Sequence, residues 1–159
     1  MTSENASDEV RQAAPGPQRV AELCAEALLA GDQASRTLGM RMEEVTPGAA
    51  RLRMAVRPDM VNGHGICHGG IVFSLADSAF AVACNTYNAV TVAAAASIDF
   101  LAPVRVNDEL TAQARELWRS NRSGIYEIVV SNQRGEPVAL FRGRSHSTGG
   151  QIVPGPVQP

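Results

Sequence analysis

The chain has 159 residues, of which 45% are hydrophobic and 19% are charged, and these values are typical of one globular domain rather than a disordered or fibrous protein. All 14 Lys and Arg positions are arginine, which excludes reactions that need a lysine amine, such as Schiff-base formation or a Walker phosphate loop. The net charge of −2 argues against binding to nucleic acid or to an anionic membrane surface.

Composition divides the chain into a folded body and two tails. Residues 1–17 are small and polar, and half of residues 148–159 are glycine or proline, so we expect both segments to be flexible and the domain to span 18–147. The three cysteines have no disulfide spacing, and the sequence shows neither a secretory signal nor a run of about 20 apolar residues. We therefore expect a cytoplasmic protein.

The predicted elements follow in chain order. Residues 18–31 form an amphipathic helix whose apolar positions have helical spacing: Val20, Leu23, Cys24, Ala27 and Leu28. A hairpin of strands at 40–45 and 49–57 follows, and the second strand alternates apolar residues with arginine. A glycine-rich loop at 58–70 leads to 70–85, which is apolar nearly all round and predicts a buried helix. Strands at 90–101, 109–119, 124–132 and 137–147 complete the domain. Strands in succession predict an α+β fold, with an antiparallel sheet wrapped around the central apolar helix.

One acid lies within this apolar helix. Asp77 is related to Ser74 by three residues and lies beside Ser78, so the three form one narrow polar stripe. Burying an unpaired carboxylate is costly, and two interpretations remain. Asp77 is either a structural acid with a hydrogen-bond partner or a general base or nucleophile in a dry cleft, and we favour the second.

The start of the helix offers a second chemical feature. His68, Gly69 and Gly70 lead into the first turn, where unpaired N–H groups can polarise a carbonyl, although the glycines equally suit a tight loop. Gly69 and Asp77 are eight residues apart, which is about 12 Å along a helix and too far for both to act on one carbonyl. In two antiparallel copies of the helix, Gly69 of one chain would face Asp77 of the other. We therefore expect a homodimer with two shared sites.

Two segments carry a family resemblance. Residues 61–70 (VNGHGICHGG) and 73–81 (FSLADSAFA) resemble the PaaI-type phenylacetate-degradation thioesterases of the hotdog superfamily, and the similarity continues at 97–103, 138–143 and 145–146. It covers most of 36–147. The resemblance implies a hotdog fold, a dimer of dimers without cofactor, and hydrolysis of aryl-acetyl-CoA thioesters such as phenylacetyl-CoA and hydroxyphenylacetyl-CoA.

The resemblance also implies roles for individual residues. Asp77 matches the general base or nucleophile, and Gly69 matches the amide of the oxyanion hole. Asn62 matches a loop residue that helps to hold the thioester, and His68 matches one that orients the loop. Gly70 and Ser78 are expected to contact the substrate. Some related thioesterases position water through a Ser or Thr on the next strand, where this chain has Ala93, with Ser97 nearby.

Several interpretations stay open. His64, Cys67 and His68 could belong to a zinc site, but only His146 remains as a further histidine and there is no paired Cys spacing, so no metal is expected. Cys67 beside His68 could be a nucleophilic pair. The chain could also be a thioesterase for different medium-chain or aromatic acyl-CoAs, a non-hydrolytic acyl-CoA binder, or a hotdog dehydratase or hydratase.

Overall fold

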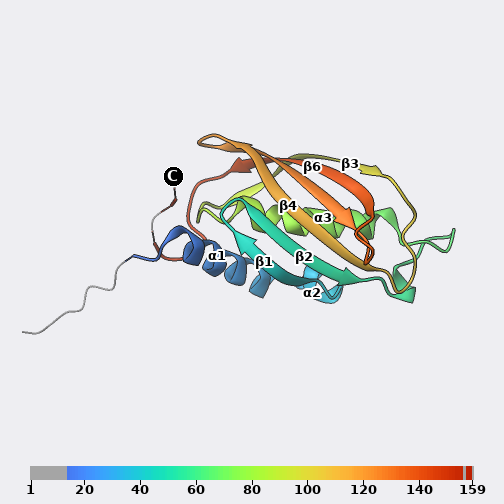
Figure 1. The fold of residues 1–159 in the computed structure, drawn as a ribbon. Helices are drawn as coiled ribbons and strands as arrows, with labels where there is room; N and C mark the ends of the chain where they lie inside the picture. The colour runs from blue at the N-terminus through green and yellow to red at the C-terminus, as the bar shows by residue number, and fades with distance from the viewer. Residues whose placement is uncertain (1–13, 156, 159) are drawn as a thin grey trace, which may run out of the picture.

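The computed structural model describes residues 14–155 and 157–158, and residues 1–13 of the predicted N-terminal tail lie outside this part (Figure 1). The helices are α1 (Pro17–Gly31), α2 (Gln33–Thr37) and α3 (Gly69–Cys84), with one short 3-10 turn, η1 (Pro58–Met60). The strands are β1 (Arg41–Thr46), β2 (Ala49–Ala55), β3 (Thr91–Phe100), β4 (Glu109–Arg119), β5 (Ser123–Ser131) and β6 (Pro137–Ser147). They form one antiparallel sheet in the order β1-β2-β4-β5-β6-β3.

The sheet has one inward and one outward face because apolar residues recur at every second position. In β2 the buried residues are Ala50, Leu52 and Met54, as the alternation predicts. Cross-strand pairing extends the inward face from Leu52 to Ala112 on β4, Val130 on β5 and Ala139 on β6. All of these side chains are buried.

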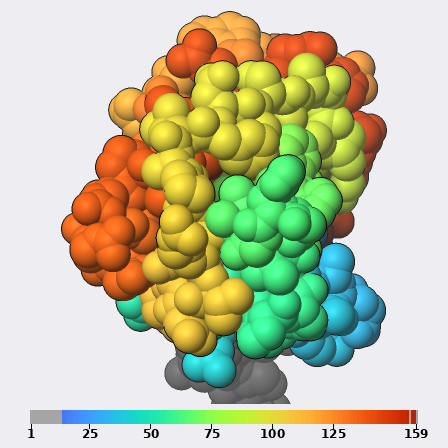
Figure 2. Space-filling model, turned by 90° about the vertical axis from the view of Figure 1, so that its right-hand side faces the viewer, coloured from blue at the N-terminus to red at the C-terminus, as the bar shows by residue number. Residues whose placement is uncertain are grey.

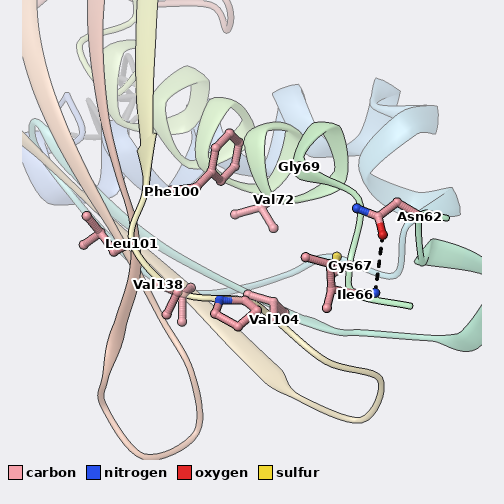
Figure 3. Close-up of a pocket in the computed structure, with 11 residues that line it drawn as sticks. Asn62, Ile66, Cys67, Gly69, Val72, Phe100, Leu101, Val104 and Val138 are labelled. Carbon is pink, nitrogen blue, oxygen red and sulfur yellow. Dashed lines mark hydrogen bonds between the residues drawn. The ribbon is translucent and has the colours of Figure 1, made fainter. Parts of the chain in front are cut away.

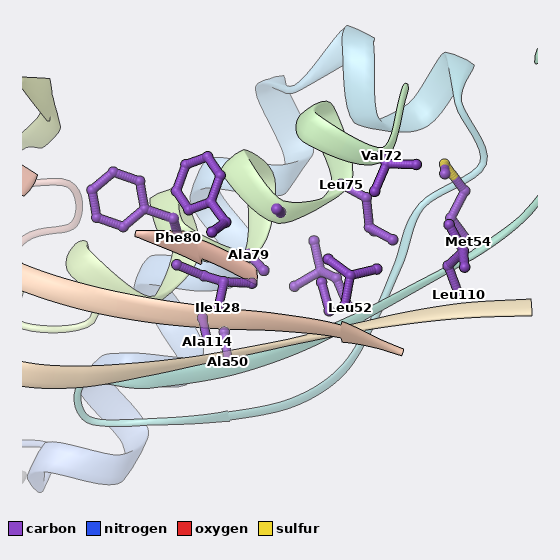
Figure 4. Close-up of a cluster of buried hydrophobic side chains, with 14 of the residues drawn as sticks. Ala50, Leu52, Met54, Val72, Leu75, Ala79, Phe80, Leu110, Ala114 and Ile128 are labelled. Atoms are coloured by element: carbon purple, nitrogen blue, oxygen red, sulfur yellow. The ribbon is translucent and has the colours of Figure 1, made fainter. Parts of the chain in front are cut away.

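Helix α3 packs across this inward face, mainly against β2, β4 and β5 (Figure 4). Leu75, Ala76 and Ala79 point into the core, where Phe80 packs against Tyr126 with ring centroids 5.4 Å apart. The predicted central helix, the order of the main elements along the chain and the α+β class with an antiparallel sheet are confirmed. The opposite side of α3 is only half-buried, so a single chain leaves part of the helix uncovered.

Two local details differ from the sequence-based expectation. In α1 the buried residues are Val20, Ala21, Cys24 and Ala25, whereas Ala27 is exposed, so the buried face is rotated from the one predicted. Helix α2 was not predicted, because five residues are too few to show a helical period.

Residues after β6 return along the body. The side-chain oxygen of Asn88 accepts hydrogen bonds from the N–H groups of Ile152 and Val153 at 3.0 and 2.9 Å, and the N–H of Gln158 donates to the Tyr87 carbonyl at 2.8 Å. The flexibility expected for 148–159 stays a prediction, but these bonds hold the segment against the loop between α3 and β3. No helix in the described ranges is long and apolar enough to cross a bilayer.

Candidate active site

The glycine-rich loop before α3 is held by backbone hydrogen bonds. The N–H of Asn62 donates to the Ile66 carbonyl, that of Cys67 to the Val104 carbonyl and that of His68 to the Met60 carbonyl, each at 2.8 Å. The bond from Cys67 ties the loop to the segment that follows β3. Figure 2 shows these two stretches side by side at one end of the molecule, green and yellow respectively.

Asn62 presents its amide nitrogen to the start of α3. Its Oδ1 accepts from the N–H of His64 at 2.9 Å and from that of Ile66 at 3.4 Å, so the oxygen is occupied within the loop. In Figure 3 the nitrogen points toward Gly69. Among the described residues no acceptor takes the Nδ2 hydrogens, and they are available to a bound molecule.

His68 caps the helix and thereby selects which amide stays unpaired. Its Nδ1 accepts from the N–H of Gly70 at 2.9 Å, and its carbonyl accepts from those of Ile71 and Val72. Over the part of the chain that the structure describes, no acceptor faces the N–H of Gly69. The first amide of the helix is therefore a free donor at the positive end of the helix dipole.

Gly70 has a steric reason to lack a side chain. A Cβ at this position would lie 3.1 Å from the Nδ1 of His68, which is tighter than ordinary contact, so a larger residue would displace the capping imidazole. Gly70 is exposed at the helix start. Its predicted contact with the substrate stays a prediction.

The two free donors border an apolar cavity of about 440 Å³ (Figure 3). The lining comes from the loop, the start of α3, the end of β3 with the segment that follows it, and the start of β6: Asn62, Ile66, Cys67, Gly69, Val72, Phe100, Leu101, Ala102, Pro103, Val104 and Val138. None of these lining residues carries a charge. Hydrogen-bond donors beside an apolar cavity suit a carbonyl that develops negative charge.

Asp77 lies farther along α3 and does not line this cavity. Its side chain is half-buried, and burial raises the pKa of the carboxyl group above its ordinary value. In the described chain it has neither a hydrogen bond nor an ion pair. The structure thus brings Asn62, Gly69 and His68 together and leaves Asp77 apart, on the half-covered side of the helix.

The serines beside Asp77 bond to other groups of the protein. The Oγ of Ser78 lies 2.9 Å from that of Ser35 in α2, and Ser35 in turn donates to Asp32 at 2.5 Å. Ser74 donates to the carbonyl of Gly70 at 2.7 Å. These bonds give Ser78 a clear role in joining α2 to α3, while its predicted substrate contact stays a prediction.

The His64–Cys67–His68 cluster does not converge on one point. His64 is exposed, Cys67 is buried, and the Nδ1 of His68 is occupied by its helix cap. Burial, with a smaller effect of Asp108, raises the pKa of the Cys67 thiol, which disfavours the thiolate that a nucleophile requires. No group of three metal-binding side chains occurs in the described residues. All three cysteines are free and buried.

Strand β3 has a free edge beside this site. Within the described ranges it ends the sheet and pairs only with β6, and its residues 92–97 are exposed on both faces. The stretch includes four successive alanines and no charge. An uncharged edge strand of this length can pair with another chain.

Sequence reasoning missed part of the cavity wall. Phe100, Leu101 and Val138 were noted only as parts of matching segments, and their convergence depends on the pairing of β3 with β6. The neighbouring Leu101 N–H donates to the Val138 carbonyl at 2.9 Å. No local signal in the sequence identifies these residues as lining one space.

An antiparallel sheet packed around one apolar helix is the architecture of the hotdog fold. The model of the thioesterase superfamily matches residues 64–139. Acyl-coenzyme A thioesterase PaaI of Escherichia coli strain K12 is 44% identical over 129 residues, which cover 81% of this chain and 92% of that protein. A putative esterase of Archaeoglobus fulgidus is 34% identical over 70% of this chain and 73% of its own length.

Solved structures agree with these relatives. The E. coli PaaI protein from the phenylacetic acid degradation operon matches with a TM-score of 0.84 and 42% identity, covering 86% of this chain and 99% of that one. A mutant of the phenylacetic acid degradation protein PaaI from Thermus thermophilus matches with a TM-score of 0.70 and 35% identity, covering 73% and 99%. The chain belongs to the PaaI-type acyl-CoA thioesterase family, and it is a hydrolase of thioester bonds.

Proposed function

We propose that the protein hydrolyses aryl-acetyl-CoA thioesters, such as phenylacetyl-CoA and hydroxyphenylacetyl-CoA, to the free acid and CoA. The observation that carries this proposal is the pair of free donors, the Gly69 N–H and the Asn62 amide, beside an uncharged cavity. The aryl-acetyl preference rests on similarity to a PaaI protein from a phenylacetic acid degradation operon.

In the proposed reaction, the thioester carbonyl oxygen lies against both donors. Negative charge grows on this oxygen as the carbonyl carbon is attacked, and the two hydrogen bonds strengthen at that moment. Asp77 either takes a proton from the attacking water or attacks the carbonyl carbon itself. The carbon–sulfur bond then breaks, and CoA leaves as a thiolate that takes up a proton. Where Asp77 itself is the nucleophile, water then hydrolyses the resulting mixed anhydride and releases the free acid.

The acid that acts at each site comes from a second copy of the chain. Within one chain Gly69 and Asp77 belong to one continuous helix of 16 residues, so they are held about 12 Å apart. Pairing of the free β3 edges of two copies would set their α3 helices side by side and antiparallel. Gly69 would then face Asp77 of the partner subunit, and each dimer would hold two sites. A further pairing of dimers gives the expected tetramer.

Thiol release from phenylacetyl-CoA and 4-hydroxyphenylacetyl-CoA tests the proposal. Asp77→Asn should lower kcat by about 10²–10⁴-fold, because it removes the base or nucleophile but keeps the shape of the side chain. Asp99→Asn is the matched control, since Asp99 is an exposed acid on the outer face of β3, opposite Leu140. Absence of thiol release from every acyl-CoA tested would refute the proposal. Unchanged release by Asp77→Asn would remove Asp77 from its role.

A further inference from the structure

Phe100, the last residue of β3, lies directly against the proposed oxyanion donor. A Cβ built on Gly69 would lie 3.0 Å from the Cζ of Phe100 and 3.4 Å from each Cε, so the tip of the ring contacts the first residue of α3 (Figure 3). Nevertheless, Phe100 is 55% exposed. A ring exposed to this extent contributes little to the core of the chain, but it lines the cavity beside Gly69.

The rest of the cavity has the character of an acyl pocket. Apart from Asn62 and the Cys67 thiol, every side chain that lines it is apolar. The pantetheine arm of CoA carries amide groups, whose burial without hydrogen-bond partners is unfavourable. A phenylacetyl group carries no polar atom beyond its carbonyl oxygen, which the two donors can bind. The cavity therefore suits the acyl group better than the pantetheine arm.

We propose that Phe100 is a specificity-determining residue whose ring packs against the acyl group while the carbonyl oxygen is bound at Gly69. This inference rests on the proposed thioesterase reaction and adds the reason for an aromatic preference. An aromatic ring one methylene from the carbonyl can stack or meet edge to face with Phe100, whereas a short aliphatic acyl group gains almost nothing from it. Phe100 touches the acyl group but takes no part in bond making.

Two substitutions separate the aromatic contact from simple apolar contact. Phe100→Leu keeps an apolar side chain but removes the ring pair, and the kcat/KM for phenylacetyl-CoA should fall about 5-fold. Phe100→Ala removes this side of the cavity wall and should lower kcat/KM for phenylacetyl-CoA about 30-fold. Most of the loss should appear as a higher KM, because the contact exists in both the ground state and the transition state. For acetyl-CoA the same variants should change kcat/KM by less than about 3-fold.

Trp118→Ala is the matched control. Trp118 is also 55% exposed, but it pairs with Ile125 near the far end of β4 and does not line the cavity. Equal losses for phenylacetyl-CoA and acetyl-CoA in Phe100→Ala would overturn the inference, because they would mean that the ring only supports the start of α3. No loss with phenylacetyl-CoA would overturn it as well.

A binding measurement keeps this test separate from the proposed reaction. If the wild-type protein releases no thiol from any acyl-CoA, the proposed function fails, but calorimetric titration with phenylacetyl-CoA still tests the pocket. Weaker binding of phenylacetyl-CoA by Phe100→Ala, with unchanged binding of acetyl-CoA, would support the role of the ring. Equal affinity of the wild type and Phe100→Ala for phenylacetyl-CoA would refute it.

Discussion

A mixed dimer of two inactive variants should recover activity if each site uses residues from both chains. The perturbations are Asn62→Ala, which removes one oxyanion donor, and Asp77→Asn, which removes the acid. In one chain the donor end of α3 and Asp77 are held about 12 Å apart by the rise of the helix. A donor and a base acting on the same carbonyl must each lie within about 3 Å of the reacting atoms. If Asp77 acts on the carbonyl bound at Gly69, as proposed, each site needs the acid of the partner subunit.

The recovered activity can be calculated from symmetry. In a mixed dimer one site combines the intact Asn62 of one chain with the intact Asp77 of the other, and the second site has lost both. A purified mixed dimer should thus have about half the wild-type activity, and random pairing of equal amounts about one quarter. Each variant alone should keep on the order of 1% or less, since loss of one oxyanion donor costs about 10²–10³-fold.

Co-expression with two different affinity tags isolates the mixed dimer, and thiol release from phenylacetyl-CoA measures its activity. Activity no higher than that of the two parent variants would refute the shared site, provided that the mixed species has the same mass as the wild-type assembly by light scattering. A control dimer carries both substitutions in one chain and none in the other. This control has one substitution in each of its two sites, so its activity should be as low as that of the parent variants.

Three further predictions concern stability and the helix start. Burial raises the pKa of Asp77, so the folded chain retains this proton to higher pH than the unfolded chain does, and the free energy of unfolding falls as the pH rises through this window. Chemical denaturation should therefore show Asp77→Asn gaining stability relative to wild type as the pH rises above the ordinary pKa range of a carboxyl group, and a difference that stays constant with pH would contradict this expectation. His68→Ala should lower the free energy of unfolding by about 1 kcal/mol and remove most of the activity. His68→Asn can still cap the helix and should retain more stability and more activity. Equal losses in the two variants would exclude the helix cap as the cause. Gly143→Ala should cost about 1–3 kcal/mol in thermal unfolding, because its Cβ would lie 2.8 Å from the Phe80 ring, while Gly31→Ala, with open space around it, should cost no stability.

Most of the fold was predictable because its signals are local. The alternation of apolar residues with arginine in 49–57 predicts which face of β2 is buried, and the structure confirms it. The apolar run at 70–85 likewise predicts α3 to within one residue at either end. Turn residues also act locally, as at Asn107 and Gly135, whose φ values of 71° and 76° suit the left-handed region.

The site was predictable only in part, because it depends on distant residues. The loop motif and the helix acid are contiguous stretches, so the sequence identifies Asn62, His68 and Asp77 as candidates. Which donors stay free depends on hydrogen bonds that the sequence does not specify, such as the one from Gly70 to His68. The cavity wall requires the end of β3 to lie beside the start of β6, and only the sheet register brings Phe100 opposite Ala139.

In the proposed reaction, the arrangement at the start of α3 explains how an uncharged site would bind a developing oxyanion. The Nδ1 of His68 accepts from the second N–H of the helix, and the His68 carbonyl accepts from the third and fourth. Of the four N–H groups in this first turn, that of Gly69 is left for a ligand. The two ends of the Asn62 amide differ likewise. Its Oδ1 accepts hydrogen bonds from two N–H groups of the loop, whereas its Nδ2 has no acceptor among the described residues. Both donors are thus fixed before the substrate arrives, which avoids reorganisation during the reaction. A substitution that only loosens the cap should therefore lower kcat even though it removes no donor.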